Sequence, residues 1–156
     1  MKKIDSKFSI FLFSLIAIII GFIACNVEEE PNPMSDNTVD YTLGIFVINE
    51  GVFPNGTGSI TYMSRNGTEK VDGLFQLSND MVPLGNNVQS MNVYPIGGEH
   101  AFITVSKANK IEVVKIKSFQ KVHTIENVSN PRYVEFSTTY GKVYISSWDN
   151  TVKVFN

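Results

Sequence analysis

Short runs of alternating apolar and polar residues, each ended by a turn sequence, fill the chain from residue 41 onwards. Alternation with a period of two is typical of strands with one buried face, and no window of 11 or more residues shows a convincing helical period. The connecting segments are rich in Gly, Asn, Asp and Pro, which favour tight turns. The pattern predicts strands at 43–49, 59–64, 71–76, 88–94, 100–106, 110–117, 121–125, 132–136, 142–148 and 151–155.

The strand pattern repeats along the chain. FITVSKANKIEVV at 102–114 matches VYISSWDNTVKVF at 143–155 at an offset of 41 residues, each copy being a strand, a polar turn with Asn and a second strand. The segments 90–93 and 131–134 match at the same offset, and a third copy with a longer turn spans 46–62. A period of about 40 residues with about four strands per repeat is typical of β-propeller blades. A β-sandwich with coincidental internal similarity is the alternative.

The number of repeats predicts an incomplete ring. Residues 41–156 are 116 residues, which at 41 per repeat make about 2.8 repeats. Propellers usually close with about 4–8 blades. The prediction is therefore an all-β fold, a partial β-propeller of about three four-stranded blades that forms the N-terminal part of a longer propeller or comes from a truncated reading frame. If the protein ends at Asn156, we expect an open fan that is marginally stable or prone to aggregation, because strand edges and apolar faces stay uncovered.

A different pattern opens the chain. Lysines precede an uninterrupted apolar run at 8–24, and the only cysteine, Cys25, follows at once. A basic start, an apolar segment and a small residue before the break indicate a secretory signal peptide. The order Phe22-Ile23-Ala24-Cys25 resembles the lipobox of bacterial lipoproteins, with Phe22 where the pattern prefers leucine, and this resemblance implies that Cys25 is acylated and becomes the mature N-terminus. An uncleaved membrane anchor and a cleaved soluble protein are the alternatives.

These patterns divide the chain into a lipoprotein signal peptide at 1–24, a lipid-anchored acidic tether at 25–40 and an incomplete β-propeller domain at 41–156. The tether contains two prolines and few bulky apolar residues, so we expect it to be flexible. Its glutamates at 28–30 resemble the acidic signal that exports lipoproteins of Bacteroidota to the outer face of the outer membrane, with simple solubility as the alternative. The predicted location is the outer membrane, lipid-anchored through Cys25 and exposed at the cell surface.

Charge and composition exclude several functions. The chain has 13 Lys and Arg against 15 Asp and Glu; without residues 1–24 the numbers are 10 and 14, a net charge of about −4. This balance gives no reason to expect nucleic acid as a partner. His100 and His123 lie 23 residues apart, and the sequence has no metal-ligand spacing and no nucleophile motif. We therefore predict no catalytic residue, no metal site and no cofactor, and expect the protein not to be an enzyme.

Polar and aromatic residues at the strand ends are the candidate ligand-binding residues, because propellers bind ligands at loops around the central channel. Asn49 and Glu50 end the first strong strand, Arg132 is the only arginine of the second half, and Trp148 is the only tryptophan. An arginine or tryptophan exposed in a loop commonly marks a binding surface. The structural alternatives are Glu50 as a turn-closing acceptor, Arg132 in an ion pair between blades and Trp148 as a cap on a blade.

Five short motifs carry a resemblance to a family; they are FVINEG at 46–51, LG at 84–85, NKIEV at 109–113, PRY at 131–133 and VYISS at 143–147. In this order they resemble the YncE-like surface propellers of Bacteroidota, a group that includes seven-bladed cobalamin-binding lipoproteins. The similarity covers about residues 43–156. It implies a non-enzymatic surface lipoprotein that captures a nutrient, cobalamin-like or similarly bulky, for a TonB-dependent outer-membrane transporter. The alternatives are a propeller enzyme whose catalytic residues lie in further blades and a protein-interaction scaffold of the cell envelope.

Overall fold

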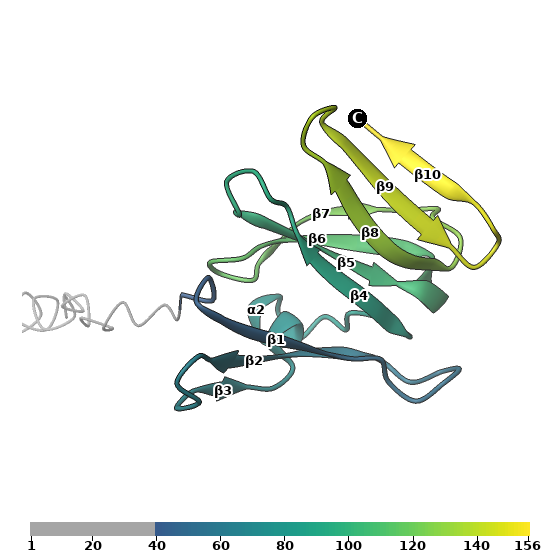
Figure 1. The fold of residues 1–156 in the computed structure, drawn as a ribbon. Helices are drawn as coiled ribbons and strands as arrows, with labels where there is room; N and C mark the ends of the chain where they lie inside the picture. Colours follow the sequence, from purple (N-terminus) through teal and green to yellow (C-terminus); the bar gives the residue numbers. More distant parts are fainter. Residues whose placement is uncertain (1–39) are drawn as a thin grey trace, which may run out of the picture. The chain divides into compact units, whose positions relative to one another are not determined.

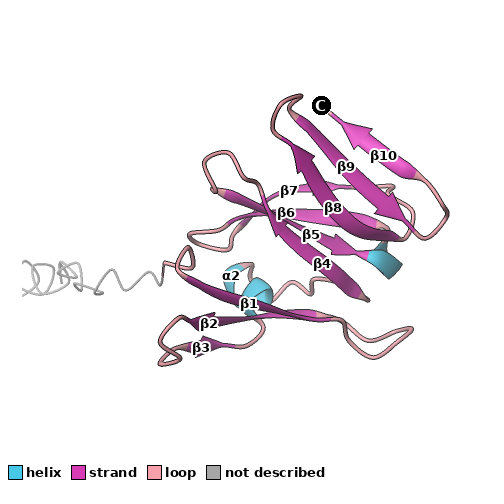
Figure 2. Ribbon diagram, viewed as in Figure 1, coloured by secondary structure: helices cyan, strands magenta, loops and turns pink. Residues whose placement is uncertain are grey.

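The computed structural model describes residues 40–156, so the predicted signal peptide, Cys25 and nearly all of the predicted tether lie outside the described residues. The described part is all-β, as the sequence predicts, and is built from three antiparallel sheets (Figures 1 and 2). Its helical content is one short helix, α2 (Leu74–Ser78), and one 3-10 turn (Ser106–Ala108). No helix among residues 40–156 is both long and apolar enough to cross a membrane.

The strands follow one another in chain order within each sheet. Sheet I has the order β1-β2-β3, with β1 (Gly44–Asn49), β2 (Ser59–Ser64) and β3 (Lys70–Val71). Sheet II has the order β4-β5-β6-β7, with β4 (Val88–Val93), β5 (His100–Val105), β6 (Lys110–Lys115) and β7 (Lys121–Ile125). Sheet III has the order β8-β9-β10, with β8 (Pro131–Ser137), β9 (Lys142–Ser147) and β10 (Val152–Phe155). Each predicted strand therefore has a counterpart in the structure.

The third strand differs most from the prediction. The sequence pattern predicts a strand at 71–76, but β3 stops at Val71 and α2 begins at Leu74. Gly73 has a φ of 65°, a left-handed conformation that ends the strand and that glycine adopts without steric cost. Leu74 and Phe75 are both fully buried. Two consecutive side chains of a strand point to opposite faces, whereas a helical turn lets both reach one core.

Sheet II is buried on both of its faces. Ile103 of β5 belongs to a core that fills the space between sheets I and II, together with side chains of β2, α2 and the buried Phe119. Its neighbour Phe102 points the other way and packs against the core between sheets II and III, which contains Val134 and Ile145. Burial of both faces explains why β5 is a continuous apolar run rather than an alternating one. The three sheets thus pack face to face in chain order.

The sequence repeat corresponds to equivalent strands in sheets II and III. A bulge interrupts β4 at Gln89 and β8 at Arg132, an offset of 43 residues. The paired second strands then correspond at an offset of 42, which matches Ile103 with Ile145, both fully buried. The single offset of 41 predicted from the sequence pairs Ile103 with Tyr144 instead, which is wrong by one residue. The third strands keep the offset of 41, because the turn between the second and third strands is one residue shorter in sheet III.

Candidate functional site

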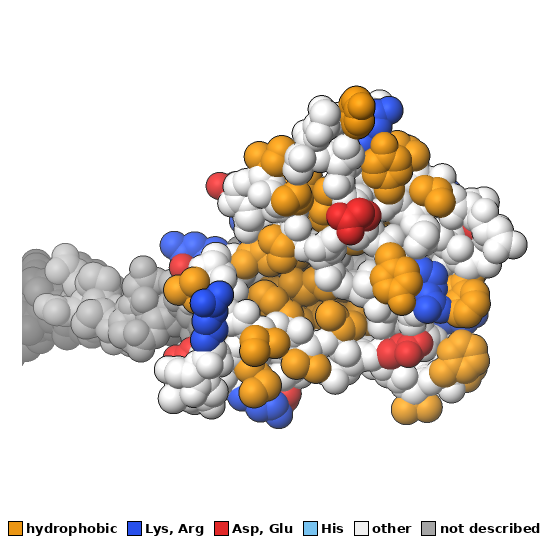
Figure 3. All heavy atoms as spheres, viewed as in Figure 1, with side chains coloured by type: hydrophobic (Ala, Val, Ile, Leu, Met, Phe, Trp, Pro, Cys, Tyr) orange, Lys and Arg blue, Asp and Glu red, His pale blue; other side chains and the backbone are white. Residues whose placement is uncertain are grey.

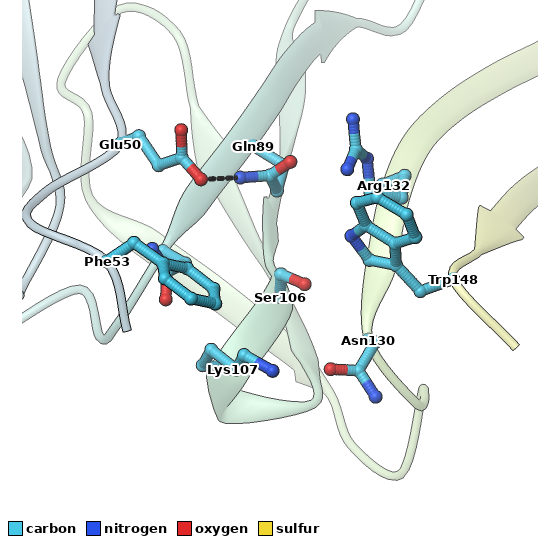
Figure 4. Close-up of a pocket in the computed structure, with 9 residues that line it drawn as sticks. Glu50, Phe53, Gln89, Ser106, Lys107, Asn130, Arg132 and Trp148 are labelled. Atoms are coloured by element: carbon cyan, nitrogen blue, oxygen red, sulfur yellow. Dashed lines mark hydrogen bonds between the residues drawn. The ribbon is translucent and has the colours of Figure 1, made fainter. Parts of the chain in front are cut away.

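A cavity of about 410 Å³ lies where strands of all three sheets begin or end (Figure 4). Its lining residues are Glu50, Phe53, Asn87, Gln89, Ser106, Lys107, Asn130, Arg132 and Trp148. The structure therefore brings together three of the four candidate residues predicted from the sequence. In the space-filling view, hydrophobic and basic side chains gather at this end of the domain, on the right (Figure 3).

One position of the cavity recurs in all three sheets. It is the residue that directly follows β1, β5 and β9, which are equivalent strands of the three repeats. Glu50 directly follows β1, Ser106 follows β5 and Trp148 follows β9. All three strands run toward the cavity, so equivalent backbone positions deliver a carboxylate, a hydroxyl and an indole to one space.

The first strands of sheets II and III supply two more repeated positions. The bulge residues Gln89 and Arg132 both line the cavity, and so do Asn87 and Asn130, two residues earlier. A bulge re-aims a side chain that a regular strand would point elsewhere. Both asparagines have a positive φ, 57° and 40°, a conformation that asparagine tolerates better than most residues.

Backbone hydrogen bonds hold these positions in the same way in both sheets. The carbonyl of Asn87 accepts the N–H of Ser106 at 2.8 Å, and the carbonyl of Asn130 accepts the N–H of Trp148 at 3.1 Å. The Asn109 side chain joins the two repeats, because its Oδ1 accepts the N–H of Asn130 at 2.9 Å. The cavity wall is therefore fixed by main-chain contacts and does not depend on a ligand.

The loop at 50–58 closes one side of the cavity and contributes Phe53. The Glu50 carbonyl accepts the N–H of Val88 at 3.2 Å, and Gly58 donates to the Gly85 carbonyl at 2.9 Å. A Cβ on Gly58 would lie 2.4 Å from Cγ2 of Val88, so the loop approaches sheet II too closely for any side chain there. The glycines of this segment are thus required by packing, in agreement with the sequence interpretation of a connecting turn.

Two cations lie against aromatic rings in the cavity. The Arg132 guanidinium lies 4.3 Å from the centre of the Trp148 ring, and the Lys107 amino group 5.7 Å from that of Phe53. Both distances are within the range of cation–π attraction. Trp148 is 65% exposed and Phe53 69%, so most of each ring surface is open to a ligand. Figure 4 shows Ser106 and Lys107 between Phe53 on one side and Trp148 and Asn130 on the other.

The amide groups of the cavity differ in their hydrogen bonding. Gln89 donates from Nε2 to the Glu50 carboxylate at 2.5 Å, which fixes both side chains (Figure 4). Asn87 is only 2% exposed, yet neither its Nδ2 nor its Oδ1 has a hydrogen-bond partner. A buried amide without partners costs about 1–3 kcal/mol. Asn87 therefore brings a buried donor and acceptor without partners to the wall of the cavity.

The turn that presents Trp148 is stabilised by Asp149. The Thr151 hydroxyl donates to the Asp149 carboxylate at 2.5 Å, and the Thr151 N–H donates to the same oxygen at 3.2 Å. The hydroxyl contact, with a smaller contribution from the backbone, holds the pKa of the exposed Asp149 carboxyl below its usual value. The charged carboxylate therefore shapes the turn that carries the tryptophan.

Asn49, the fourth candidate residue, lies away from this cavity. Its amide donates to the hydroxyls of Ser59 at 3.3 Å and Thr61 at 3.2 Å, and Thr61 in turn donates to Asp72. It lines a separate surface hollow on sheet I. Asn49 and Glu50 are adjacent at a strand end, so their side chains diverge.

Six lining residues were not singled out from the sequence; they are Phe53, Asn87, Gln89, Ser106, Lys107 and Asn130. The repeat at its sequence offset of 41 pairs Trp148 with Lys107, so it could have found that residue. Gln89 and Ser106 are the equivalents of Arg132 and Trp148 only once the pairing of the strands is known. The other three residues have no such signal in the sequence.

No protein-family model matches the chain, and no curated protein is similar to it in sequence. The chemistry of the cavity is therefore interpreted from its own geometry. Within residues 40–156 no three His, Cys, Asp or Glu side chains cluster closely enough to hold a metal ion. The cavity instead combines exposed rings, two cations and amide groups, a set suited to holding a polar organic molecule.

Proposed function

We propose that residues 41–156 are consecutive blades of a β-propeller that presents a ligand-binding site at the cell surface, on a protein lipid-anchored in the outer membrane through Cys25. In a propeller, sheets pack face to face in chain order and equivalent loops of successive blades surround one channel. The order of sheets I, II and III and their two shared cores are consistent with that arrangement. The basic, apolar and cysteine pattern at residues 1–25 supports the anchor.

One observation carries the binding function. Equivalent positions in successive repeats, occupied by different side chains, line a single cavity. Glu50, Ser106 and Trp148 occupy one such position, and Gln89 and Arg132 another. A cavity assembled in this way offers a varied polar and aromatic lining on a rigid scaffold, as a binding site requires.

The composition of the cavity favours binding over catalysis. Glu50 is the carboxylate of the lining, and the Gln89 amide already occupies one of its oxygens. General acid–base hydrolysis requires a second carboxylate or a nucleophile hydrogen-bonded to its base; the lining has no second carboxylate, and Glu50 bonds to Gln89 rather than to the Ser106 hydroxyl. The resemblance of the sequence motifs to YncE-like surface propellers adds the proposed role, which is capture of a bulky nutrient, cobalamin-like or similar, and its delivery to a TonB-dependent transporter.

Calorimetric titration of the full chain, purified in detergent, with cyanocobalamin tests this function. We expect a Kd below about 1 mM and at least a tenfold weaker affinity in Trp148→Ala, because an exposed ring at a binding centre commonly contributes more than 1 kcal/mol. Tyr140→Ala is the matched control, since Tyr140 is 74% exposed and does not line the cavity. Both variants should keep the parental circular dichroism spectrum. No binding below the millimolar range would refute the cobalamin version.

A further inference from the structure

The geometry points to a specific class of ligand: a heteroaromatic ring that carries an anionic group, either carboxylate or phosphate. This inference rests on the proposed binding function and adds the chemistry that the cavity recognises. Three features of the cavity support it, namely its unpaired cations, its exposed rings and its unsatisfied buried amide.

The charges of the lining favour an anion. Arg132 and Lys107 are its cations and Glu50 its carboxylate, which gives an excess of one positive charge on a chain whose net charge is −2. The ion pairs within residues 40–156 join Lys70 to Asp72 and Lys110 to Glu112, so neither cavity cation takes part in one. Glu50 is held by Gln89 rather than by a cation. Both cations thus remain available to a carboxylate or a phosphate.

The aromatic surface of the cavity favours a flat ring. Trp148 and Phe53 lie on opposite sides in Figure 4 and are each about two-thirds exposed. The Arg132 guanidinium, which lies against Trp148, adds a second flat surface beside the indole. Flat rings stack on both tryptophan and guanidinium groups, so a planar ligand can contact either surface.

The buried amide favours a ring whose edge has a donor beside an acceptor. Asn87 lines the cavity and is 98% buried, and its side-chain NH2 group and carbonyl oxygen both lack partners in the described structure. Asparagine pairs in two-point fashion with such an edge, as it does with adenine. The cavity of about 410 Å³ is at the small end of the range for organic ligands, so it accommodates one ring system with its charged substituent, either alone or as part of a bulkier nutrient.

Titration of the full chain with AMP, adenosine and inorganic phosphate tests this inference. Because Trp148 is the only tryptophan of the chain, its fluorescence reports directly on the cavity. We expect AMP to change the Trp148 emission, with adenosine and phosphate each at least tenfold weaker, since hydrogen bonds to charged groups contribute more than neutral ones. The affinities of benzoate and benzyl alcohol repeat the comparison for a ligand with and without a carboxylate. Together with the AMP series, they show whether the cavity prefers a carboxylate or a phosphate.

Matched variants assign the effect to named residues. Arg132→Gln and Lys107→Gln should each reduce the preference for AMP over adenosine by about tenfold. Arg65→Gln and Lys117→Gln, exposed and at the opposite end of the sheets, should leave it unchanged. Asn87→Gly should weaken AMP and adenosine equally, because it removes the contact to the ring and not to the anion. Circular dichroism confirms folding, and the exposed Lys107 keeps the test valid if Arg132→Gln misfolds.

The outcomes separate this inference from the function on which it rests. Equal affinity for AMP and adenosine, or a preference that survives both cation substitutions, would overturn the anion selectivity. If cyanocobalamin binds the parent protein and both cation variants with the same affinity, the proposed function is supported and this inference is overturned. If neither the nucleotides nor cyanocobalamin bind and the Trp148 emission never changes, both are wrong.

Discussion

Replacing Asn87 with glycine should stabilise the protein while it weakens binding. The Asn87 amide is buried at 2% exposure without partners, and its backbone has a φ of 57°. Glycine removes the unsatisfied amide and adopts this φ without a steric penalty. The vacated space opens into the cavity, where water can enter. The substitution should therefore raise the free energy of unfolding and lower the affinity for a ligand.

The expected gain is about 1 kcal/mol. Removing a buried donor and acceptor without partners recovers about 1–3 kcal/mol, and the larger conformational freedom of glycine in the unfolded chain costs about 0.5–1 kcal/mol. For a domain of this size, 1 kcal/mol corresponds to an increase in Tm of about 3–5 °C. Thermal unfolding of the full chain, followed by circular dichroism, measures it.

Asn109→Gly is the matched control. Asn109 has almost the same φ, 54°, but its Oδ1 accepts the N–H of Asn130 at 2.9 Å. Glycine there removes a hydrogen bond that is already made, so it should destabilise the fold by about 1 kcal/mol. A Tm for Asn87→Gly as low as that for Asn109→Gly would refute the reasoning, because the Asn87 amide would then be satisfied in the unliganded protein.

Three further predictions address the anchor, the core and the turn at the cavity. Cys25→Ser should release the protein from the membrane fraction without changing its circular dichroism spectrum, because stable anchoring needs the acyl chains; membrane retention would refute lipidation. Lys110→Met should lower the free energy of unfolding in urea by about 3 kcal/mol, since it leaves the Glu112 carboxylate, 2% exposed, without its cation. Thr151→Val should raise the pKa of Asp149 toward its usual value, measured by NMR titration. The depressed pKa stabilises the fold above the unfolded-state pKa, and this contribution is lost as the pH falls through the folded-state pKa, so the variant, whose two pKa values lie closer together, should lose less stability on acidification.

Alternation was enough to predict the sheets, because each strand pairs with its neighbour in the chain and the turns carry Gly or Asn. It failed at 71–76, where Gly73 is left-handed and two consecutive buried residues require a helical turn. Nothing in a strand pattern distinguishes a glycine that ends a strand from one that lies within it. The one-residue error in the repeat alignment has another cause: the turn between the second and third strands is one residue shorter in sheet III, so a single offset cannot fit both strands.

The cavity was predictable where a rare residue falls near the end of a strand. Trp148 and Arg132 stand out in the sequence because each is uncommon there, and both line the cavity. Gln89 and Ser106 are ordinary residues whose role depends on bulge position and strand direction. Asn87 is invisible to sequence reasoning for a stronger reason: its importance lies in hydrogen bonds that it does not make, and these can be counted only in three dimensions.

Comparison of equivalent residues in the repeats distinguishes the positions that pack in the core from the positions that line the cavity. At one fully buried position the two later repeats carry the same residue, Ile103 and Ile145, because the volume between sheets restricts the choice. At the cavity the same comparison pairs Ser106 with Trp148, which differ in size and chemistry. Packing places no such restriction on a position that faces an open space. The proposed function accounts for this difference, because a binding site needs varied side chains at equivalent positions whereas the core needs a fixed volume.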